Sequence, residues 1–92
     1  MGYKVGHSQK RNRFEIECNG EIAYLEYMIA DGVMDILHTI VPEPMEGKGT
    51  ASALTKQALE YARENHLSVV PTCAFAENYM IRHKEYEDLL LP

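Results

Sequence analysis

The sequence predicts an α/β (α+β) fold, with an antiparallel strand meander followed by a helix–strand–helix unit, and three observations predict it. Polar and apolar residues alternate from Arg13 to Cys18, as they do in a half-buried strand. Asn19-Gly20 and Asp31-Gly32 are two-residue hairpin signals. After Gly49, apolar residues recur at spacings of three and four, which is typical of an amphipathic helix.

The first half of the chain is expected to hold the meander. Its strands are Arg13–Cys18, Glu21–Ala30 and Val33–Val41, and Tyr3–His7 is assigned to pair at its edge. Tyrosine and isoleucine in the second of these strands are strong β-formers. Pro42-Glu43-Pro44 then ends the strand pairing, because proline has no N–H to donate.

The second half is expected to form a long helix, a strand and a short helix. The apolar face of the long helix holds Ala51, Leu54, Ala58 and Ala62. Asn65 is its expected stop. Leu67–Cys73 is a buried strand in which Pro71 indicates an edge, a bulge or a splayed end. Ala76–Lys84 forms the short helix, and Leu89–Leu91 packs down against the core. The strand–helix–strand unit should be right-handed, with parallel strands.

Composition confines the chain to one domain, residues 1–92, and excludes several function classes. A net charge of −5 argues against a nucleic-acid binder, because phosphate backbones recruit basic surfaces. The two cysteines and four histidines lack metal-ligand spacing, so no metal site is predicted. No segment is apolar enough to span a membrane or to act as a signal peptide, so no membrane partner is expected and the expected location is cytoplasmic.

Gly47-Lys48-Gly49 stands at the start of the long helix, and two interpretations are open. Glycines let backbone N–H groups approach a ligand, and a helix N-terminus adds partial positive charge, so the segment suits a phosphate. Alternatively, the glycines only make a tight turn. The P-loop is excluded because Glu43 stands where its first glycine should be, and the dinucleotide motif because Ser52 replaces a glycine.

The segment Glu46-Gly47-Lys48-Gly49-Thr50-Ala51 resembles motif A of the GNAT superfamily of N-acetyltransferases, which cradles the pyrophosphate of acetyl-coenzyme A. That motif reads glutamine or arginine, two variable residues, glycine, one variable residue, and glycine or alanine. Gly49 and Ala51 match it, whereas Glu46 departs from it and brings an acid close to the phosphates.

The resemblance extends along most of the chain. The matching residues are Arg13-Phe14-Glu15, His38-Thr39-Ile40-Val41-Pro42, Gly47-Lys48-Gly49, Ala62-Arg63, Val70-Pro71-Thr72-Cys73, Tyr79, Arg82-His83 and Tyr86. Together they resemble a compact GNAT branch of about this length, the small GNAT-like proteins of the YjdJ type. The resemblance implies the GNAT acyl-CoA N-acyltransferase fold, with a splayed pair of parallel strands, and N-acetyltransferase (acyltransferase) activity.

The resemblance also implies where acetyl-CoA binds. The pantetheine arm would lie between the ends of the two parallel strands and pair with the backbone at Ile40 and Val41. The pyrophosphate would bind the N–H groups of Gly47, Lys48, Gly49, Thr50, Ala51 and Ser52. Asn78, Arg82 and Lys84 could approach the far side of the cofactor, although a basic helix end is equally expected from the helix dipole alone.

Cys73 is the first of three candidates for the chemistry of acetyl transfer. This reaction needs a neutral amine, a polarised thioester carbonyl and a stabilised or protonated leaving thiolate. The resemblance places Cys73 near the thioester, where it could accept the acetyl group and pass it on. The alternative is a buried, small, apolar side chain.

His38 and Tyr79 are the other two candidates. By strand alternation His38 is expected to share a face with Ile36 and Ile40. It is a general base if that face meets the cofactor gap, and a structural histidine if the face meets the core. Tyr79 stands in the short helix, where GNAT enzymes often use a tyrosine to protonate the leaving thiolate. Otherwise Tyr79 caps the core.

The acceptor side is expected to be open, because residues 1–32 are predicted as strands and turns rather than as the N-terminal helices of typical GNAT enzymes. The amine would then come from a large molecule, or a second subunit would complete the pocket, so a monomer or a homodimer is expected. The acidic balance favours a basic acceptor, either a small molecule or a protein lysine or N-terminus. Two rival functions stay open: a non-catalytic coenzyme A-binding module, and a small protein-interaction domain.

Overall fold

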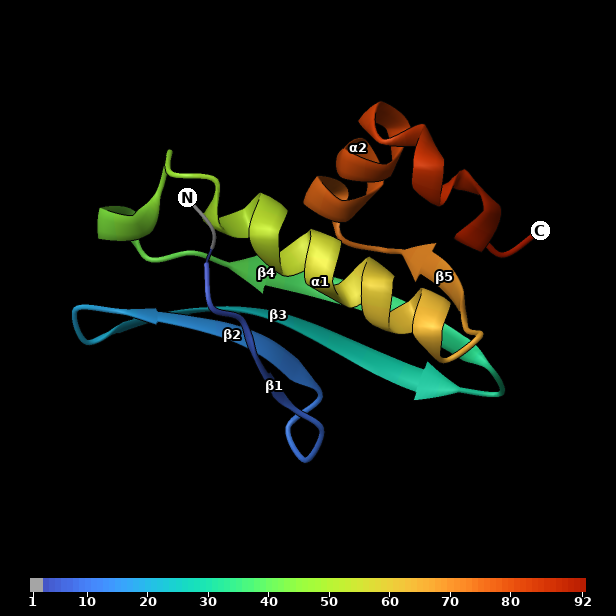
Figure 1. The fold of residues 1–92 in the computed structure, drawn as a ribbon, viewed down its shortest axis with the longest axis horizontal. Helices are drawn as coiled ribbons and strands as arrows, with labels where there is room; N and C mark the ends of the chain where they lie inside the picture. Colours follow the sequence, from blue (N-terminus) through green and yellow to red (C-terminus); the bar gives the residue numbers. More distant parts are fainter. Residues whose placement is uncertain (1–2) are drawn as a thin grey trace.

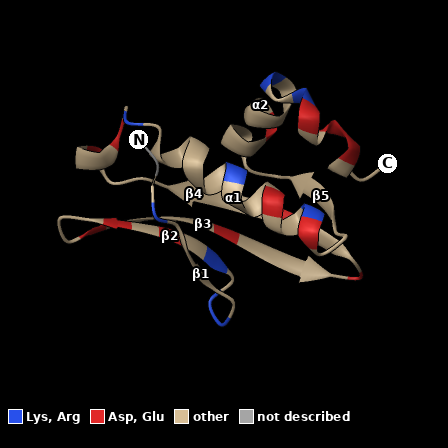
Figure 2. Ribbon diagram, in the orientation of Figure 1, with Lys and Arg blue, Asp and Glu red and all other residues tan. Residues whose placement is uncertain are grey.

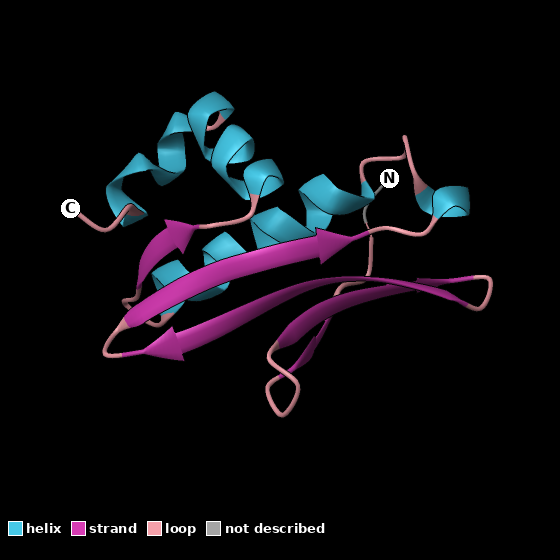
Figure 3. Ribbon diagram, turned by 180° about the vertical axis from the view of Figure 1, so that it is seen from behind, coloured by secondary structure: helices cyan, strands magenta, loops and turns pink. Residues whose placement is uncertain are grey.

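The computed structural model describes residues 3–92, which form a five-stranded sheet with the helices on one of its faces (Figure 1). The elements in chain order are β1 (Gly6–Ser8), β2 (Arg13–Cys18), β3 (Glu21–Ala30), β4 (Val33–Ile40), the 3-10 helix η1 (Glu43–Met45), α1 (Thr50–Glu64), β5 (Ser68–Pro71), α2 (Ala74–Arg82) and the 3-10 helix η2 (Lys84–Leu89). The view from behind again shows both α-helices on the same side of the strands (Figure 3). The predicted α/β fold is therefore confirmed.

Two tight hairpin turns join β2 to β3 and β3 to β4. Asn19 and Gly20 have φ angles of 52° and 83°, and Asp31 and Gly32 have φ angles of 53° and 77°. Two successive positive φ angles are what a type I′ turn requires, and Asn-Gly and Asp-Gly adopt them at low cost. Both hairpins predicted from these dipeptides are confirmed.

The strands lie in the order β1-β2-β3-β4-β5, and β4–β5 is the parallel pair. Helix α1 connects these two strands, as predicted. Three strand boundaries differ from the prediction: Gly6–Ser8 replaces Tyr3–His7, Val33–Ile40 replaces Val33–Val41, and Ser68–Pro71 replaces Leu67–Cys73. The fifth strand is shorter because the chain turns after Pro71, where the Thr72 N–H donates to the Val70 carbonyl oxygen at 3.1 Å.

A β-bulge interrupts the pairing of β3 with β4. Glu26 pairs with His38 and Tyr27 pairs with Ile36, so Leu37 is the extra residue. An extra residue reverses the alternation of side chains beyond it. Ile36 is fully buried under the helices, whereas His38 lies on the opposite face of the sheet with Ile40. The prediction that His38 shares a face with Ile36 was therefore wrong, and the prediction for Ile40 was right.

The core lies between the sheet and α1. Leu54, Ala58, Leu59 and Ala62 are fully buried on one face of α1. They pack against the sheet face that carries Leu25 and Ile36. Three of these four helix positions were predicted, and Leu59 lies one position from the predicted stripe. No helix within residues 3–92 combines the length and the apolar character that crossing a bilayer requires.

The C-terminal segment folds back along α1 through the unpredicted helix η2. The Tyr86 hydroxyl donates to Glu60 at 2.6 Å, and the Arg63 guanidinium donates to Asp88 at 2.9 Å. Helix α2 covers Ala74–Arg82 instead of Ala76–Lys84. Of the three terminal leucines only the first, Leu89, is buried, so the prediction that all three pack down was wrong for the last two.

Candidate functional site

The glycine turn before α1 adopts a backbone that only glycine takes up without strain. Gly47 has a φ of 74° and Gly49 a φ of 77°, both in the left-handed region. A Cβ atom added at either glycine would meet no atom within 4 Å. Backbone conformation rather than crowding therefore requires these glycines, and the space in front of them is open.

Helix α1 begins without a side-chain cap. Its first backbone bond runs from the Ala53 N–H to the Gly49 carbonyl oxygen at 3.0 Å, so the N–H groups of the first three helical residues have no acceptor within the helix. The Thr50 hydroxyl donates to the Met45 carbonyl oxygen at 3.1 Å, which fastens the turn but caps no N–H group. The open helix end carries partial positive charge and suits an anion.

A cavity of about 370 Å³ lies in front of this helix end. Its lining residues are Val41, Met45, Glu46, Gly47, Gly49, Thr50, Ala51, Ser52, Phe75 and Arg82. Seven of them belong to the predicted cofactor set: Val41, Gly47, Gly49, Thr50, Ala51, Ser52 and Arg82. Figure 2 shows basic residues at the end of α2, and Arg82 stands in the last turn of this helix. The positive end of α1 and the guanidinium of Arg82 thus line one space, together with the carboxylate of Glu46.

A second cavity, of about 360 Å³, adjoins the first and extends it towards β4. The two share Val41, Glu46, Ala51 and Phe75, and the second adds Thr39 and Ile40. Ile40, another predicted cofactor residue, therefore lines the strand side of the space. A continuous surface runs from the glycine turn to the end of β4.

Two predicted cofactor residues lie outside both cavities. Lys48 lines a separate hollow beside the β2–β3 turn, and its carbonyl oxygen accepts a hydrogen bond from the Tyr3 hydroxyl. Asn78 is exposed on α2 and lines neither cavity. Phe75, Met45 and Thr39 were not predicted. Phe75 precedes Arg82 by seven residues, which is two helical turns, so the shared face of α2 could have revealed it.

The parallel strands separate next to this surface. Their last register pair is Ile36 with Pro71, and the Cys73 N–H still donates to the Ile36 carbonyl oxygen at 2.9 Å. Helix α2 then begins, while β4 continues to Ile40 beside β3 alone. The predicted splayed end is therefore present, and it leaves one edge of β4 without a partner strand.

Cys73 lies where the strands separate, as the N-cap residue of α2. Its side chain is half-buried, and its Sγ atom lies 3.6 Å from the Thr39 hydroxyl oxygen. Thr39 lines the second cavity. The thiol therefore borders the strand end of the cavity surface, with a hydroxyl within hydrogen-bonding distance.

His38 contacts neither Cys73 nor the cavity. Its Nε2 atom lies 2.8 Å from Glu26 Oε1, on the sheet face away from the helices, and its ring makes a T-shaped contact with the Tyr24 ring. His38 lies in β4 beyond the point where the parallel strands separate, and Cys73 comes just after β5, but the two residues are on different faces of the sheet. His38 therefore does not lie beside Cys73 in this structure.

Tyr79 packs inside the C-terminal layer. Its ring stacks on His83 at a centroid distance of 4.0 Å and lies 6.5 Å from the ring of Phe75. Burial, and then the nearby carboxylates of Glu85 and Glu60, raise the pKa of Tyr79 above its ordinary value. The phenol therefore stays protonated at neutral pH, and Phe75 separates it from the cavities that it does not line.

The comparisons with known proteins agree with one another. A family model described as GCN5-related N-acetyl-transferase matches residues 13–89. Protein NATD1 from Gallus gallus is 32% identical over 81 residues, which cover 84% of this chain and 73% of that protein. Protein NATD1 from Homo sapiens is 31% identical over 84% of this chain and 71% of that protein. The solution structure of a GCN5-like protein from Staphylococcus aureus superposes with a TM-score of 0.74 at 29% identity, over 98% of this chain and 89% of that one.

Proposed function

The chain belongs to the family of GCN5-related N-acetyltransferases, and from that premise we propose that residues 1–92 form one domain that transfers the acetyl group of acetyl-CoA to an amine. One observation carries the proposal. The uncapped N-terminus of α1 and the side chain of Arg82 line a single cavity, which continues to the splayed strand ends where Cys73 lies. A pyrophosphate fits the polar end of this surface, and a thioester fits the other.

In the proposed complex, the pyrophosphate accepts hydrogen bonds from the N–H groups between Gly47 and Ser52. Arg82 adds a charge-assisted hydrogen bond from the opposite wall. The pantetheine amides pair with the free edge of β4 at Ile40 and Val41, which line the strand side. Neither Lys48 nor Asn78 lines the cavity, so the Lys48 side chain would contribute through long-range attraction and the Asn78 side chain only through a changed rotamer.

The proposed reaction has two transfers. The Cys73 thiolate attacks the thioester carbonyl, so that a new C–S bond forms and the bond to the coenzyme A sulfur breaks. In the proposal Tyr79 supplies the proton that this leaving sulfur needs, after the Phe75 side chain, which separates the two in this structure, moves aside. The raised pKa of Tyr79 keeps its phenol protonated until then. The amine then attacks the acetyl group on Cys73, a C–N bond forms, and the C–S bond breaks to release the Cys73 thiolate. In the proposal the proton that the amine loses reaches His38 through water, because His38 lies on the other face of the sheet.

Acetyl-CoA titrated into the purified protein by calorimetry tests the proposal first. We expect saturable binding with one molecule per chain, and an intact mass that grows by one acetyl group. Spermidine and a lysine-containing peptide, added next, should discharge that group. Absence of binding at millimolar acetyl-CoA would overturn the proposal and leave Gly47-Lys48-Gly49 as a turn. Binding without transfer to any amine would instead favour a coenzyme A-binding module.

Glu46 is the one acid that lines both cavities, and its replacement by glutamine is expected to tighten acetyl-CoA binding. A carboxylate near the phosphates repels them, and an exposed charge pair is worth about 0.2–1 kcal/mol, so Kd should fall by about 1.4- to fivefold. The difference should shrink at high salt, because salt screens exposed charges. Glu43→Gln, in η1 and outside the cavities, is the matched control for calorimetry. Weaker binding of Glu46→Gln would show that the carboxylate helps to hold the turn.

A further inference from the structure

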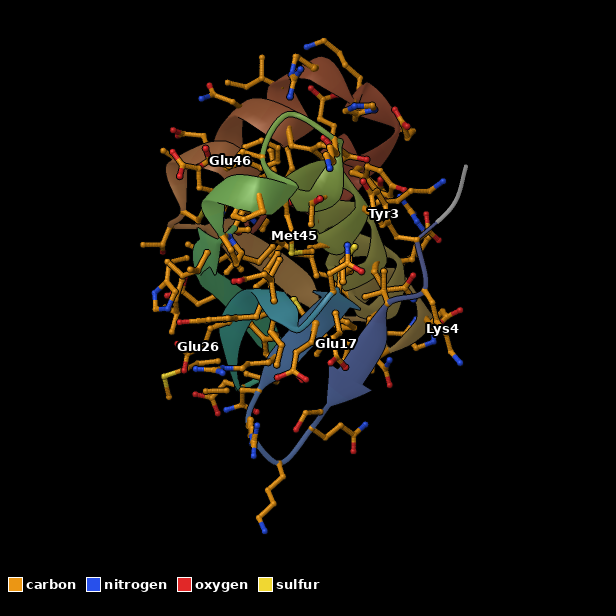
Figure 4. The ribbon with its side chains drawn as sticks, turned by 90° about the vertical axis from the view of Figure 1, so that its left-hand side faces the viewer. Tyr3, Lys4, Glu17, Glu26, Met45 and Glu46 are labelled. Carbon is orange, nitrogen blue, oxygen red and sulfur yellow. The ribbon has the colours of Figure 1, made fainter. Side chains whose placement is uncertain are left out.

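The hollow beside the β2–β3 turn, of about 180 Å³, lies behind the glycine turn. Lys48 lines this hollow and not the first cavity, whereas Gly49 lines the first cavity and not the hollow. Met45 is buried and lines both, so it belongs to the wall between them. In Figure 4, Met45 lies between Tyr3, which borders the hollow, and Glu46, which borders the first cavity. The peptide unit that joins Lys48 to Gly49 therefore crosses from one space to the other.

The N-terminal segment before β1 reaches this hollow. Figures 1 and 3 both show the chain before β1 running beside the beginning of α1. In this segment Val5 is half-buried and packs against the core, which anchors the backbone. The Tyr3 hydroxyl then donates a hydrogen bond to the Lys48 carbonyl oxygen. A hydroxyl from the start of the chain therefore holds the middle residue of the glycine turn.

The hydrogen bond from Tyr3 sets the direction of the Gly49 N–H group. A trans peptide unit is planar, so its C=O and N–H bonds point in opposite directions. Because the Lys48 carbonyl oxygen is held on the hollow side, the Gly49 N–H of the same unit is turned towards the first cavity, which Gly49 lines. This N–H donates to no backbone acceptor within residues 3–92. It is therefore available to an anion in front of α1.

The same peptide unit would turn over easily without this hydrogen bond. Turning it over changes the φ of Gly49 from 77° to a negative value, and glycine adopts both signs about equally well. Crowding does not prevent the change, because even a Cβ atom at Gly49 would meet no atom within 4 Å. The Lys48 carbonyl oxygen would then face the first cavity, where its partial negative charge repels a phosphate. A phosphate site at this turn therefore needs a donor behind it.

We propose that Tyr3 is a positioning residue of the phosphate site, which holds the Lys48 carbonyl oxygen behind the turn so that the Gly49 N–H donates to the pyrophosphate. This inference rests on the proposed function. Tyr3 lines only the hollow, so it acts through the backbone of the turn and touches neither acetyl-CoA nor the amine. The pyrophosphate does not react, so the N–H binds it equally in the substrate complex and in the transition state. Loss of the hydroxyl should therefore change KM for acetyl-CoA and not kcat.

Tyr3→Phe tests the proposal, because it removes the hydroxyl and keeps the ring. Calorimetry should give a Kd about two- to tenfold higher than that of the wild type, both for acetyl-CoA and for pyrophosphate alone, which is what one neutral hydrogen bond is worth. KM for acetyl-CoA should rise by the same factor, while kcat with a lysine-containing peptide stays within about twofold. Tyr24→Phe is the matched control, because Tyr24 lies under Arg13 and lines neither the hollow nor the first cavity.

The amide signal of Gly49 supplies a readout that depends on neither turnover nor ligand. A hydrogen bond to a carbonyl oxygen polarises the N–H of the same peptide unit. In nitrogen–proton NMR spectra of the free proteins, the Gly49 signal should therefore move in Tyr3→Phe and stay in place in Tyr24→Phe. An unmoved signal, an unchanged Kd in Tyr3→Phe, or an equal loss of affinity in Tyr24→Phe would overturn the role of Tyr3 alone. A wild-type protein that binds neither pyrophosphate nor acetyl-CoA would overturn the proposed function itself.

Discussion

Replacing Cys73 with alanine is expected to abolish the acetyl-enzyme and to lower kcat by about 10²- to 10⁴-fold, the largest loss expected from any single side chain. The Sγ atom is half-buried at the strand separation, 3.6 Å from the Thr39 hydroxyl, which borders the cavity surface. Without the sulfur, no group of Cys73 can hold the acetyl group between the two transfers. Intact mass after incubation with acetyl-CoA measures the first effect, and steady-state amine acetylation measures the second.

The controls for Cys73→Ala separate chemistry from binding and folding. Calorimetry should give an acetyl-CoA Kd within about twofold of the wild type, because the helix end and Arg82 are untouched. Cys18 is the other free thiol, and it is exposed at the end of β2. Cys18→Ala should therefore keep both the acetyl gain and the rate. Full turnover by Cys73→Ala would mean that the amine attacks acetyl-CoA directly, with no covalent intermediate.

The parts of the fold that follow from local chemistry were predictable. Asn19-Gly20 and Asp31-Gly32 fix two hairpins because their four positive φ angles suit those residues. The apolar period of three and four located α1 to within a residue of its start. Pro71 correctly indicated a strand end, since it lacks the N–H that continued pairing needs.

The bulge at Leu37 was not predictable in the same way. No glycine, proline or turn dipeptide marks it, and the pattern of Val33–Ile40 fits an unbroken strand. The extra residue lies where β4 is still paired with β3 on either side of it but its pairing with β5 has ended at Ile36, and these pairings are tertiary features. Its consequence for the site is large, because it moves His38 to the face opposite Ile36 and beside Glu26. The contact between Glu26 and His38 could therefore not be predicted from the sequence.

In the candidate site, too, the residues of one continuous segment were predictable and the residues from distant segments were not. The glycine turn is one continuous segment, so five of its six predicted residues line the cavity. The sixth, Lys48, lies on the other side of the turn, because the alternating glycines turn successive residues in different directions. Phe75 and Thr39 come from distant segments, and only the packing of α2 beside β4 brings them to the cavity. Local sequence patterns therefore do not show which distant residues line the opposite walls of the cavity.

Replacing Gly49 with aspartate is expected to weaken acetyl-CoA binding by at least about 100-fold, because juxtaposed like charges cost several kcal/mol. The aspartate carboxylate would stand at the N-cap of α1, where the open N–H groups face the cavity. It would stand beside the open N–H groups, in the space proposed for the pyrophosphate. Any side chain at a φ of 77° also strains the backbone, so the variant should bind poorly and unfold at a lower temperature than the wild type.

Gly49→Asn is the matched control, because asparagine has the shape of aspartate, tolerates the left-handed backbone at a φ of 77° and carries no charge. The affinity of Gly49→Asn for acetyl-CoA should fall by less than about tenfold, because the asparagine amide is neutral and does not repel the phosphates. Gly32→Asp introduces the same residue at the same φ of 77° in the β3–β4 turn, so it controls for backbone strain and should bind normally. Calorimetry at fixed salt gives the three affinities, and thermal unfolding reports the three stabilities. Equal losses in Gly49→Asp and Gly49→Asn would mean that strain, and not charge, weakens binding. That result would remove the anion from this helix end and with it the structural basis for a phosphate-bearing substrate.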